Sequence, residues 1–236
     1  MIRFKPLPGL TIATLIAVAI LVWLGVWQLQ RLEWKLNLIA TMNAHMAAAP
    51  LTLEQILAMP ADAAQYRRVA LTGRFANDKE TYVFTTGPGG VPVYHVLTPF
   101  QTGSGKTVLV DRGEISEDKL DPKSRDAVTG ETKVVGIWRV PDGPNYFTPK
   151  PDPARHIWYG RDLPAIAAAT HVALAAPALV EADATPNPGG WPKGGQTVVD
   201  LPNNHLSYAF TWFGLAAALL GVYLAFHVSK GRLSLG

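Results

Sequence analysis

The sequence predicts an α+β fold in which two transmembrane helices flank a single strand-rich extracytoplasmic domain. Two long stretches, residues 6–30 and 201–229, contain no Asp, Glu, Lys or Arg. A helix needs about 20 apolar residues to cross a bilayer core of about 30 Å, so each stretch is long enough to span a membrane. Between them, short runs of β-type residues alternate with turn signals, which is typical of a sheet.

The first transmembrane helix is expected at residues 10–30, which are rich in Leu, Ile, Val and Ala. A cleavable signal peptide is the alternative, because Arg3 and Lys5 would form its basic end. However, the apolar region of a signal peptide usually holds about 7–15 residues. The nearest run of small residues, at 47–49, also lies well past the apolar stretch. We therefore expect this segment to be retained as an anchor.

Charge predicts the orientation of both spans. Both tails carry basic residues and no acidic ones, and Lys and Arg concentrate on the cytoplasmic side of a membrane. We therefore expect a multi-pass protein of a bacterial inner (cell) membrane with both termini in the cytoplasm. The expected segments are a cytoplasmic tail at 1–9, the first span at 10–30, a periplasmic domain at 31–206, the second span at 207–228 and a second cytoplasmic tail at 229–236.

The formal net charge of +3 follows from this topology. Four of the 21 Lys and Arg residues lie in the tails, whereas all 18 Asp and Glu residues lie between the spans. The central domain is therefore slightly acidic, which gives no support for nucleic-acid binding, since that needs a basic patch. The absence of cysteine excludes structural disulfides, thiolate metal sites and c-type haem attachment.

The region between the spans is long enough for one domain with its own core. Its β-type runs are separated by glycine-rich turns such as residues 87–90 and 103–105. Strands are expected at Arg68–Phe75, Glu80–Thr85, Val91–Phe100, Lys106–Arg112, Thr132–Val140 and His156–Gly160.

Three helical segments are expected beside these strands. The first span should continue as a helix through Arg31–Met46, because that stretch lacks Pro and Gly. A short helix is plausible at Leu53–Met59. Another is expected at Leu163–Thr170, with Asp162 as its N-cap and Pro164 in its first turn.

Two patterns in the sequence suggest enzymatic chemistry, but neither predicts an active site. Gly105-Lys106-Thr107 resembles the end of a phosphate-binding loop, but Phe100 stands where that motif needs glycine, and a strand follows where a helix is required. We therefore expect no nucleotide site. The carboxylates of Asp111 and Glu114 lie close together, and we interpret them as part of a solvated turn. The sequence also lacks a Gly-x-Ser-x-Gly elbow and a His-x-x-x-His pair.

The start of the second apolar stretch gathers polar and aromatic residues. On a helix, His205 shares a face with Tyr208, Ala209 and Trp212. This face offers a ligand, two aromatic walls and a small residue between them, which would suit a flat apolar macrocycle with an imidazole as axial ligand. The alternative is an interfacial belt, because Tyr and Trp gather at membrane edges whatever their function.

Three separated stretches carry a resemblance to a known family. They are Leu24-Gly25-Val26-Trp27-Gln28-Leu29-Gln30-Arg31-Leu32-Glu33-Trp34-Lys35, Tyr66-Arg67-Arg68-Val69 followed by Gly73-Arg74-Phe75, and Asn203-Asn204-His205-Leu206-Ser207-Tyr208-Ala209-Phe210-Thr211-Trp212-Phe213-Gly214. Together they resemble the Surfeit locus protein 1 family of cytochrome c oxidase assembly factors. The segment 108–113 is also similar, but residues 114–116 are Glu-Ile-Ser where the family often has Trp, a branched residue and Pro.

The resemblance implies a non-enzymatic factor that helps to build the catalytic subunit of a haem-copper terminal oxidase. Bacterial members are described as binding haem a, and the implicated positions correspond to His205 and Trp212. We therefore expect haem a as cofactor, His205 as axial ligand of its iron, and Trp212 and Tyr208 shaping the pocket. The expected partners are the oxidase catalytic subunit, the machinery of haem a synthesis and the lipid bilayer. A cofactor-free membrane scaffold that stabilises an assembly intermediate is the alternative.

Four further residues bear on this site. Trp27 and Gln28, near the outer end of the first span, could line it, although helix packing with interfacial anchoring is the alternative. Arg67 and Arg68 could pair with haem propionates, but we favour a surface ion pair.

The histidine near the end of the second span, His227, is a poor second axial ligand. Its 22-residue separation from His205 corresponds to about 33 Å along a helix. A second ligand would have to come from another part of the protein or from another chain.

Overall fold

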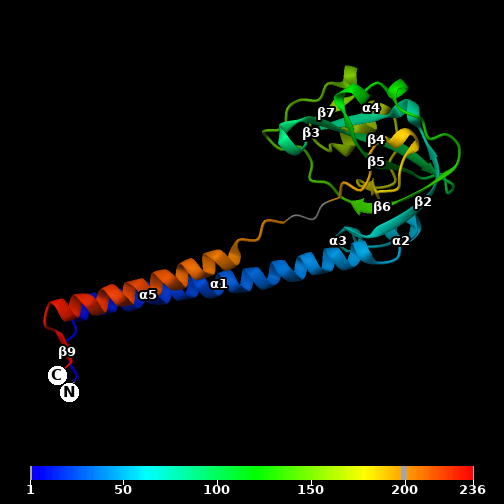
Figure 1. Ribbon diagram of the computed structural model, residues 1–236. Coiled ribbons are helices and arrows are strands. Elements are labelled where there is room, and N and C mark those ends of the chain that lie inside the picture. Colours follow the sequence, from blue (N-terminus) through cyan, green and yellow to red (C-terminus); the bar gives the residue numbers. More distant parts are fainter. Residues whose placement is uncertain (1, 198–200, 236) are drawn as a thin grey trace. The chain divides into compact units, whose positions relative to one another are not determined.

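The computed structural model of the protein describes residues 2–197 and 201–235. The chain divides into two compact units, residues 1–41 with 200–236 and residues 42–199. The first unit contains two long helices, and the second contains a large sheet (Figure 1). Each unit is described by itself below.

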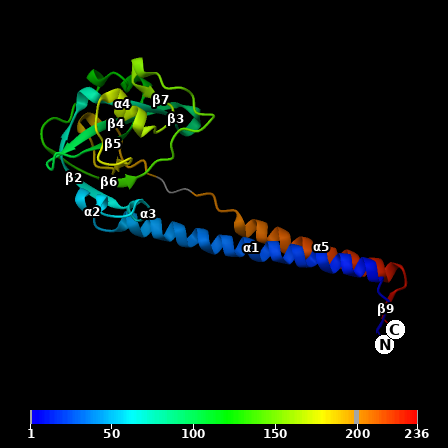
Figure 2. The ribbon, with the colours of Figure 1, turned by 180° about the vertical axis from the view of Figure 1, so that it is seen from behind.

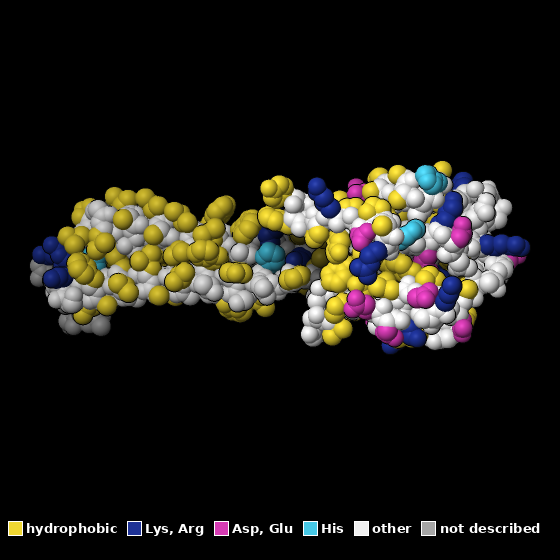
Figure 3. Space-filling model, turned by 90° about the horizontal axis from the view of Figure 1, so that it is seen from above, with side chains coloured by type: hydrophobic (Ala, Val, Ile, Leu, Met, Phe, Trp, Pro, Cys, Tyr) yellow, Lys and Arg dark blue, Asp and Glu magenta, His cyan; other side chains and the backbone are white. Residues whose placement is uncertain are grey.

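The helical unit is built from α1 (Pro8–Ala47) and α5 (His205–Ser229), which lie side by side in both ribbon views (Figures 1 and 2). Both helices are long and apolar enough to cross a membrane by length and composition. The expected continuation of the first helix beyond the apolar stretch is confirmed, since α1 extends to Ala47. Hydrophobic side chains cover much of the visible surface of this pair in Figure 3, and basic side chains gather at the end that holds the termini.

The two helices pack antiparallel along a regular seam. The less exposed positions of α1 recur every three or four residues at Thr11, Thr14, Val18, Leu21, Gly25 and Gln28, which is the period of coiled-coil packing. Gly25 is required at this seam, because a Cβ atom there would lie 2.6 Å from the ring of Phe213. Near the other end of the seam, the hydroxyls of Thr11 and Tyr223 lie 2.6 Å apart.

The two ends of the chain meet beside the helix pair. Strand β1 (Ile2–Phe4) pairs antiparallel with β9 (Leu233–Leu235). His227 is fully buried here; its Nδ1 lies 2.9 Å from the carbonyl oxygen of Tyr223, and its Nε2 lies 3.4 Å from the amide nitrogen of Leu7. With the proton on Nδ1, the ring accepts one of the amide hydrogens that the start of α1 leaves without an intrahelical partner.

The described part of the second unit, residues 42–197, contains seven strands and three short α-helices. The strands are β2 (Arg68–Phe75), β3 (Thr81–Thr86), β4 (Pro92–Thr102), β5 (Thr107–Ser116), β6 (Thr132–Arg139), β7 (Ile157–Trp158) and β8 (Leu179–Ala182). The helices are α2 (Leu53–Leu57), α3 (Ala61–Ala64) and α4 (Leu163–Thr170). Short 3₁₀ turns lie at Asn77–Lys79, Pro88–Gly90, Glu117–Lys119, Pro122–Ser124, Pro153–Arg155 and Pro188–Gly190.

The sheet closes into a five-stranded barrel with a two-strand extension. Its strand order is β2-β6-β8-β5-β4-β3-β7, and an additional pairing of β2 with β4 closes the ring. β5 and β8 run parallel, as do β3 and β7, whereas the other neighbours are antiparallel. Closure depends on Gly73, where a Cβ atom would lie 2.1 Å from the carbonyl oxygen of Gln101. This is the architecture of a Greek-key barrel such as the OB-fold.

Among the described residues three apolar clusters hold the sheet together, and the third joins β3, β4, β5 and β7 through Tyr82, Tyr94, Val96, Ile115 and Ile157. The largest one includes Leu71, Phe100, Val108, Val110, Val134, Trp138 and Val180. The second lies where α4 packs on the sheet through Leu163 and Ile166, against Leu97, Leu109 and Leu179. The side chain of Asp162 caps α4 by accepting a hydrogen bond from the amide of Ala165.

The expected strands and the α4 helix are confirmed within a few residues. Two expectations were incomplete or wrong. Strand β8, which lies centrally between β5 and β6, was not expected. The solvated turn proposed around Asp111 is wrong, because Asp111 and Arg112 lie within β5 and are only 2% and 3% exposed.

Candidate functional site

The structure places His205 at the first residue of α5. Pro202 precedes the helix, and its carbonyl oxygen accepts a hydrogen bond from Nζ of Lys35 on α1. Asn204, the N-cap residue, makes no side-chain hydrogen bond to the helix end. The helix start is thus held by a contact with α1, and His205 is presented half-buried at the end of the seam.

The imidazole of His205 is oriented by Gln28 on α1. The Nδ1 atom of His205 lies 2.7 Å from Oε1 of Gln28. With the imidazole proton on Nδ1, the ring donates to this amide oxygen. Among the described residues, Nε2 makes no hydrogen bond and keeps its lone pair. A metal-ligating histidine is usually held in this way, by a hydrogen bond from its other ring nitrogen.

The other residues expected to shape the site differ in how far they are exposed to solvent. Ala209 is 2% exposed and faces the seam, and Trp212 is half-buried one turn further along α5. Tyr208 is 55% exposed. Trp27 is 39% exposed, and the guanidinium of Arg31 lies 5.7 Å from the centre of its ring. The structure therefore brings His205 and Gln28 into contact and places Tyr208 and Trp27 on more open faces.

The donor set at His205 suits a metal macrocycle better than a bare ion. In the part of the chain that the structure describes, no three His, Cys, Asp or Glu side chains come together as a metal site. A single imidazole with a free Nε2 is enough for haem, because the macrocycle itself supplies the equatorial ligands. Trp212 is half-buried on the same helix.

A buried charged network surrounds Asp111 in the barrel unit. Its carboxylate lies 3.0 Å from Nδ1 of His95 and 2.8 Å from Nη2 of Arg161, and Arg161 also lies 3.6 Å from Glu181. Burial favours the neutral imidazole, but the bond to the Asp111 carboxylate outweighs this and raises the pKa of His95. Burial likewise opposes ionisation of Asp111, yet His95 and Arg161 lower its pKa.

This network has the character of a structural ion cluster. The space beside it is only about 10 Å³, which is too small for a substrate. The hydroxyl of Thr197 donates to Glu181 at 2.7 Å, so it is committed to that carboxylate.

A second buried cluster lies on the opposite face of β5. Arg112 and Arg125 both contact the carboxylate of Glu80, and the hydroxyl of Tyr82 donates to it at 2.7 Å. Burial and the neighbouring Glu80 raise the pKa of Tyr82. Both clusters escaped the sequence analysis, although one signal was present: Asp111 and Arg112 directly follow three apolar strand residues, so they continue the strand on its two opposite faces.

The arginines considered as partners of propionates have ordinary surface contacts. Arg68 lies 3.7 Å from Asp183, with both side chains 33% exposed, so the expected surface ion pair is confirmed for Arg68 only. Nε of Arg67 donates to the carbonyl oxygen of Ala63 at 3.3 Å.

Comparison with known proteins gives a consistent assignment. The profile of the SURF1 family matches residues 15–217. Surfeit locus protein 1 of Mus musculus is 37% identical over 221 residues, covering 83% of this chain and 68% of that protein. The Homo sapiens protein is 36% identical over 218 residues, covering 83% and 70%, and that of Takifugu rubripes is 35% identical over 230 residues, covering 88% and 92%. The chain therefore belongs to the SURF1 family.

Proposed function

We propose that this protein is an assembly factor for a haem-copper terminal oxidase and that it binds haem a through Nε2 of His205. The observation that carries the proposal is the 2.7 Å contact between Nδ1 of His205 and Oε1 of Gln28. With the ring proton on Nδ1, this contact leaves Nε2 unprotonated and able to ligate iron. Membership of the SURF1 family supports the assembly role.

The membrane setting of the proposal follows from charge and length. The basic tails favour a cytoplasmic position for both termini, and the barrel unit then lies in the periplasm of a bacterial inner membrane. His205 contacts Gln28, which lies three residues before Arg31, the first charge after the apolar stretch of α1. His205 would therefore lie near the outer membrane surface, where an apolar ring can enter from the bilayer while its propionates remain in water.

Each residue of the site has a distinct part in binding. His205 supplies the axial ligand, and Gln28 holds the imidazole in the required orientation. Trp212 offers an aromatic wall beside the small side chain of Ala209. Haem a is then the cargo that the protein holds and passes to the oxidase catalytic subunit, after receiving it from the machinery that synthesises it.

A cofactor-free scaffold is the second candidate function. The tight contact between Gly25 and Phe213 shows that part of the second-span motif serves helix packing. In this alternative the hydrogen bond between His205 and Gln28 would lock the same helix pair, and the protein would stabilise an assembly intermediate without carrying haem.

An optical spectrum distinguishes these candidates. The protein would be purified in detergent from cells that synthesise haem a, beside His205→Ala and a control, His171→Asn, whose exposed side chain lies in the barrel unit. Asparagine tolerates the left-handed conformation of residue 171. We expect haem a absorption in the wild type and the control and its loss in His205→Ala.

Two outcomes would contradict haem a binding through His205. If folded wild-type protein carries no haem a but still captures the oxidase subunit, haem carriage is wrong and the scaffold stands. Retention of the full haem spectrum in His205→Ala would instead show that another residue is the ligand.

A further inference from the structure

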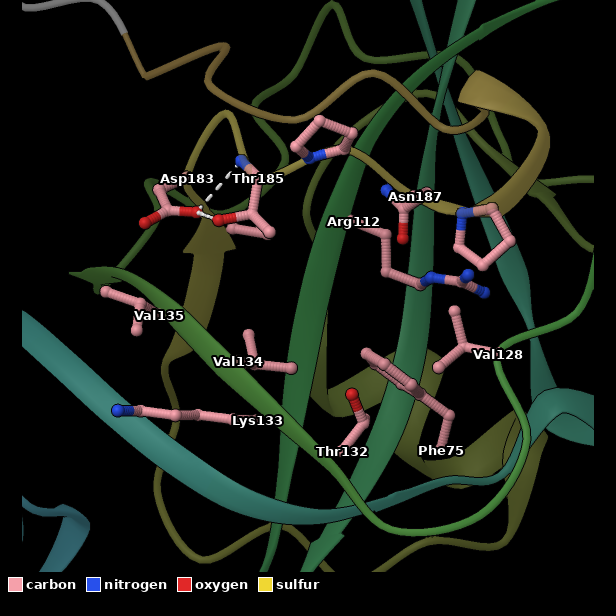
Figure 4. Close-up of a pocket in the computed structure, with 13 residues that line it drawn as sticks. Phe75, Arg112, Val128, Thr132, Lys133, Val134, Val135, Asp183, Thr185 and Asn187 are labelled. Atoms are coloured by element: carbon pink, nitrogen blue, oxygen red, sulfur yellow. Dashed lines mark hydrogen bonds between the residues drawn. The ribbon is translucent and has the colours of Figure 1, made fainter.

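A cavity of about 190 Å³ opens at one mouth of the barrel. Its walls come from the end of β2, from β5, from the first half of β6 and from the segment that follows β8 (Figure 4). Phe75, Val128 and Val134 form apolar walls, and Thr132 and Asn187 add polar groups. The mouths of β-barrels are preferred places for small-molecule sites.

Arg112 is a buried charged residue in the wall of this cavity. Its side chain is only 4% exposed, and Figure 4 shows its guanidinium over Phe75, between Asn187 and Val128. The ring centre of Phe75 lies 4.8 Å from the guanidinium carbon. Among the described residues, Nε of Arg112 has no hydrogen-bond partner although it is buried. Its one hydrogen bond there joins Nη1 to Glu80 at 3.5 Å, so most of its five donors are free.

The charge of Arg112 is incompletely balanced. Arg125 makes the closer contacts with Glu80, and Tyr82 donates to the same carboxylate. Two buried guanidinium groups thus share one carboxylate. Burial lowers the pKa of Arg112, Glu80 raises it, and the charge of Arg125 lowers it further. A buried charge needs a counter-charge to offset the cost of desolvation. With two guanidinium groups and one carboxylate, the cluster carries an excess positive charge that a bound anion would neutralise.

The rim of the cavity does not supply that anion. Asp183 is the acid there, but its carboxylate accepts two hydrogen bonds from Thr185 and lies 3.7 Å from Arg68. The rim also carries Lys133, whose side chain is exposed and adds positive charge.

We propose that the barrel mouth binds an organic carboxylate with a small apolar body, held by the guanidinium of Arg112. A planar guanidinium matches a carboxylate in two parallel hydrogen bonds, and the body would lie against Phe75, Val128 and Val134. The cavity is smaller than the roughly 300 Å³ at which sites for drug-sized ligands begin, so the body is the size of one apolar side chain. This site lies within the barrel unit and is independent of the proposed haem site.

Two sources present this chemistry: a free small carboxylate and the C-terminal carboxylate of a polypeptide that ends in an apolar residue. The probes for the test are therefore 3-phenylpropionate, an N-acetylated tetrapeptide that ends in Phe, and the carboxamide of each. Binding would be measured by titration calorimetry on the full chain in detergent.

Two variants and one control define the site. Arg112→Gln removes the anchor, and Val128→Trp fills the cavity from a half-exposed wall while leaving the charges intact. Lys106→Gln removes an exposed charge in the turn between β4 and β5, outside the cavity. Circular dichroism would confirm that each variant is folded.

We expect at least one of the two acids to bind and its carboxamide to bind at least tenfold more weakly. We expect Arg112→Gln and Val128→Trp each to lower the affinity for the acid at least tenfold, and Lys106→Gln to leave it unchanged. Preference for phenylpropionate would indicate a metabolite, and preference for the peptide acid would indicate a chain terminus. If Arg112→Gln fails to fold, Val128→Trp decides the question. The proposal is overturned if neither acid binds, if acid and carboxamide bind equally, or if Val128→Trp binds as the wild type does.

Discussion

At the scale of single residues, the contact between His205 and Gln28 determines what the imidazole can do. A free imidazole exchanges its proton between two nitrogens and turns about its side-chain bonds. The amide oxygen of Gln28 lies 2.7 Å from Nδ1; it orients the ring and accepts a hydrogen bond when the proton is on Nδ1. A neighbour that never touches the metal can therefore affect binding strongly.

Replacing Gln28 tests this role. Gln28→Leu removes the acceptor, and we expect haem a affinity to fall by about 10–100-fold, which is usual for loss of such a partner. Gln28→Glu keeps an acceptor oxygen and should recover most of the affinity. Gln30→Leu, at an exposed position two residues away, is the control. Titration of haem a into detergent-purified protein, followed optically, measures each affinity; equal weakening in the Leu and Glu variants would refute a hydrogen-bonding role.

At the same scale, the buried ion clusters are a feature that the sequence did not predict. Asp111 and Arg112 have charged side chains, and their local pattern indicated a solvated turn. Their burial depends on partners that are remote in sequence: Arg161 lies 50 positions from Asp111, and Glu80 lies 32 positions from Arg112. Such pairs form only when the barrel closes, so the local pattern can place the two side chains on opposite faces of a strand but cannot identify their partners.

At the scale of elements, local chemistry decides what can be predicted. Helix α4 was expected at its observed bounds because Asp162 and Pro164 mark its start. Strand β2 was expected from its own alternation of side chains. Strand β8 has four residues, too few for a period, and it becomes a strand by pairing with both β5 and β6.

The helix pair offers a test of packing at this scale. Gly25→Leu would drive a side chain into the ring of Phe213, which lies 2.6 Å from the position of a Cβ atom at residue 25. Overpacking of this kind typically costs about 1–3 kcal/mol. We expect a lower thermal unfolding temperature in detergent and, because α5 is displaced from Gln28, a loss of haem a.

Gly221→Leu is the matched control for that substitution. Gly221 lies in the middle of α5, and a Cβ atom there would have no neighbour within 4 Å. We therefore expect it to keep both the unfolding temperature and the haem content of the wild type. If Gly25→Leu behaves in the same way as Gly221→Leu, close packing at Gly25 does not hold the helices together.

At the scale of the whole molecule, the barrel architecture alone would misdirect a functional assignment. OB-type barrels often bind oligonucleotides or oligosaccharides on one sheet face. Here α4 packs on the outer side of β4 and β5 through Leu163 and Ile166, and the chain between the spans carries more acidic than basic residues. A fold hosts many functions, and in this protein the expectation of haem binding rests on His205 and on family membership.

The absence of cysteine makes the proposed membrane topology directly measurable. Single cysteines at Glu131, an exposed residue before β6, and at Ser229, the last residue of α5, would be probed with a membrane-impermeant maleimide in bacterial spheroplasts. Because basic tails stay in the cytoplasm, we expect Glu131→Cys to be labelled in intact spheroplasts and Ser229→Cys only after permeabilisation. The opposite pattern would place the barrel unit in the cytoplasm, where His205 would face the wrong membrane surface for the proposed delivery of haem.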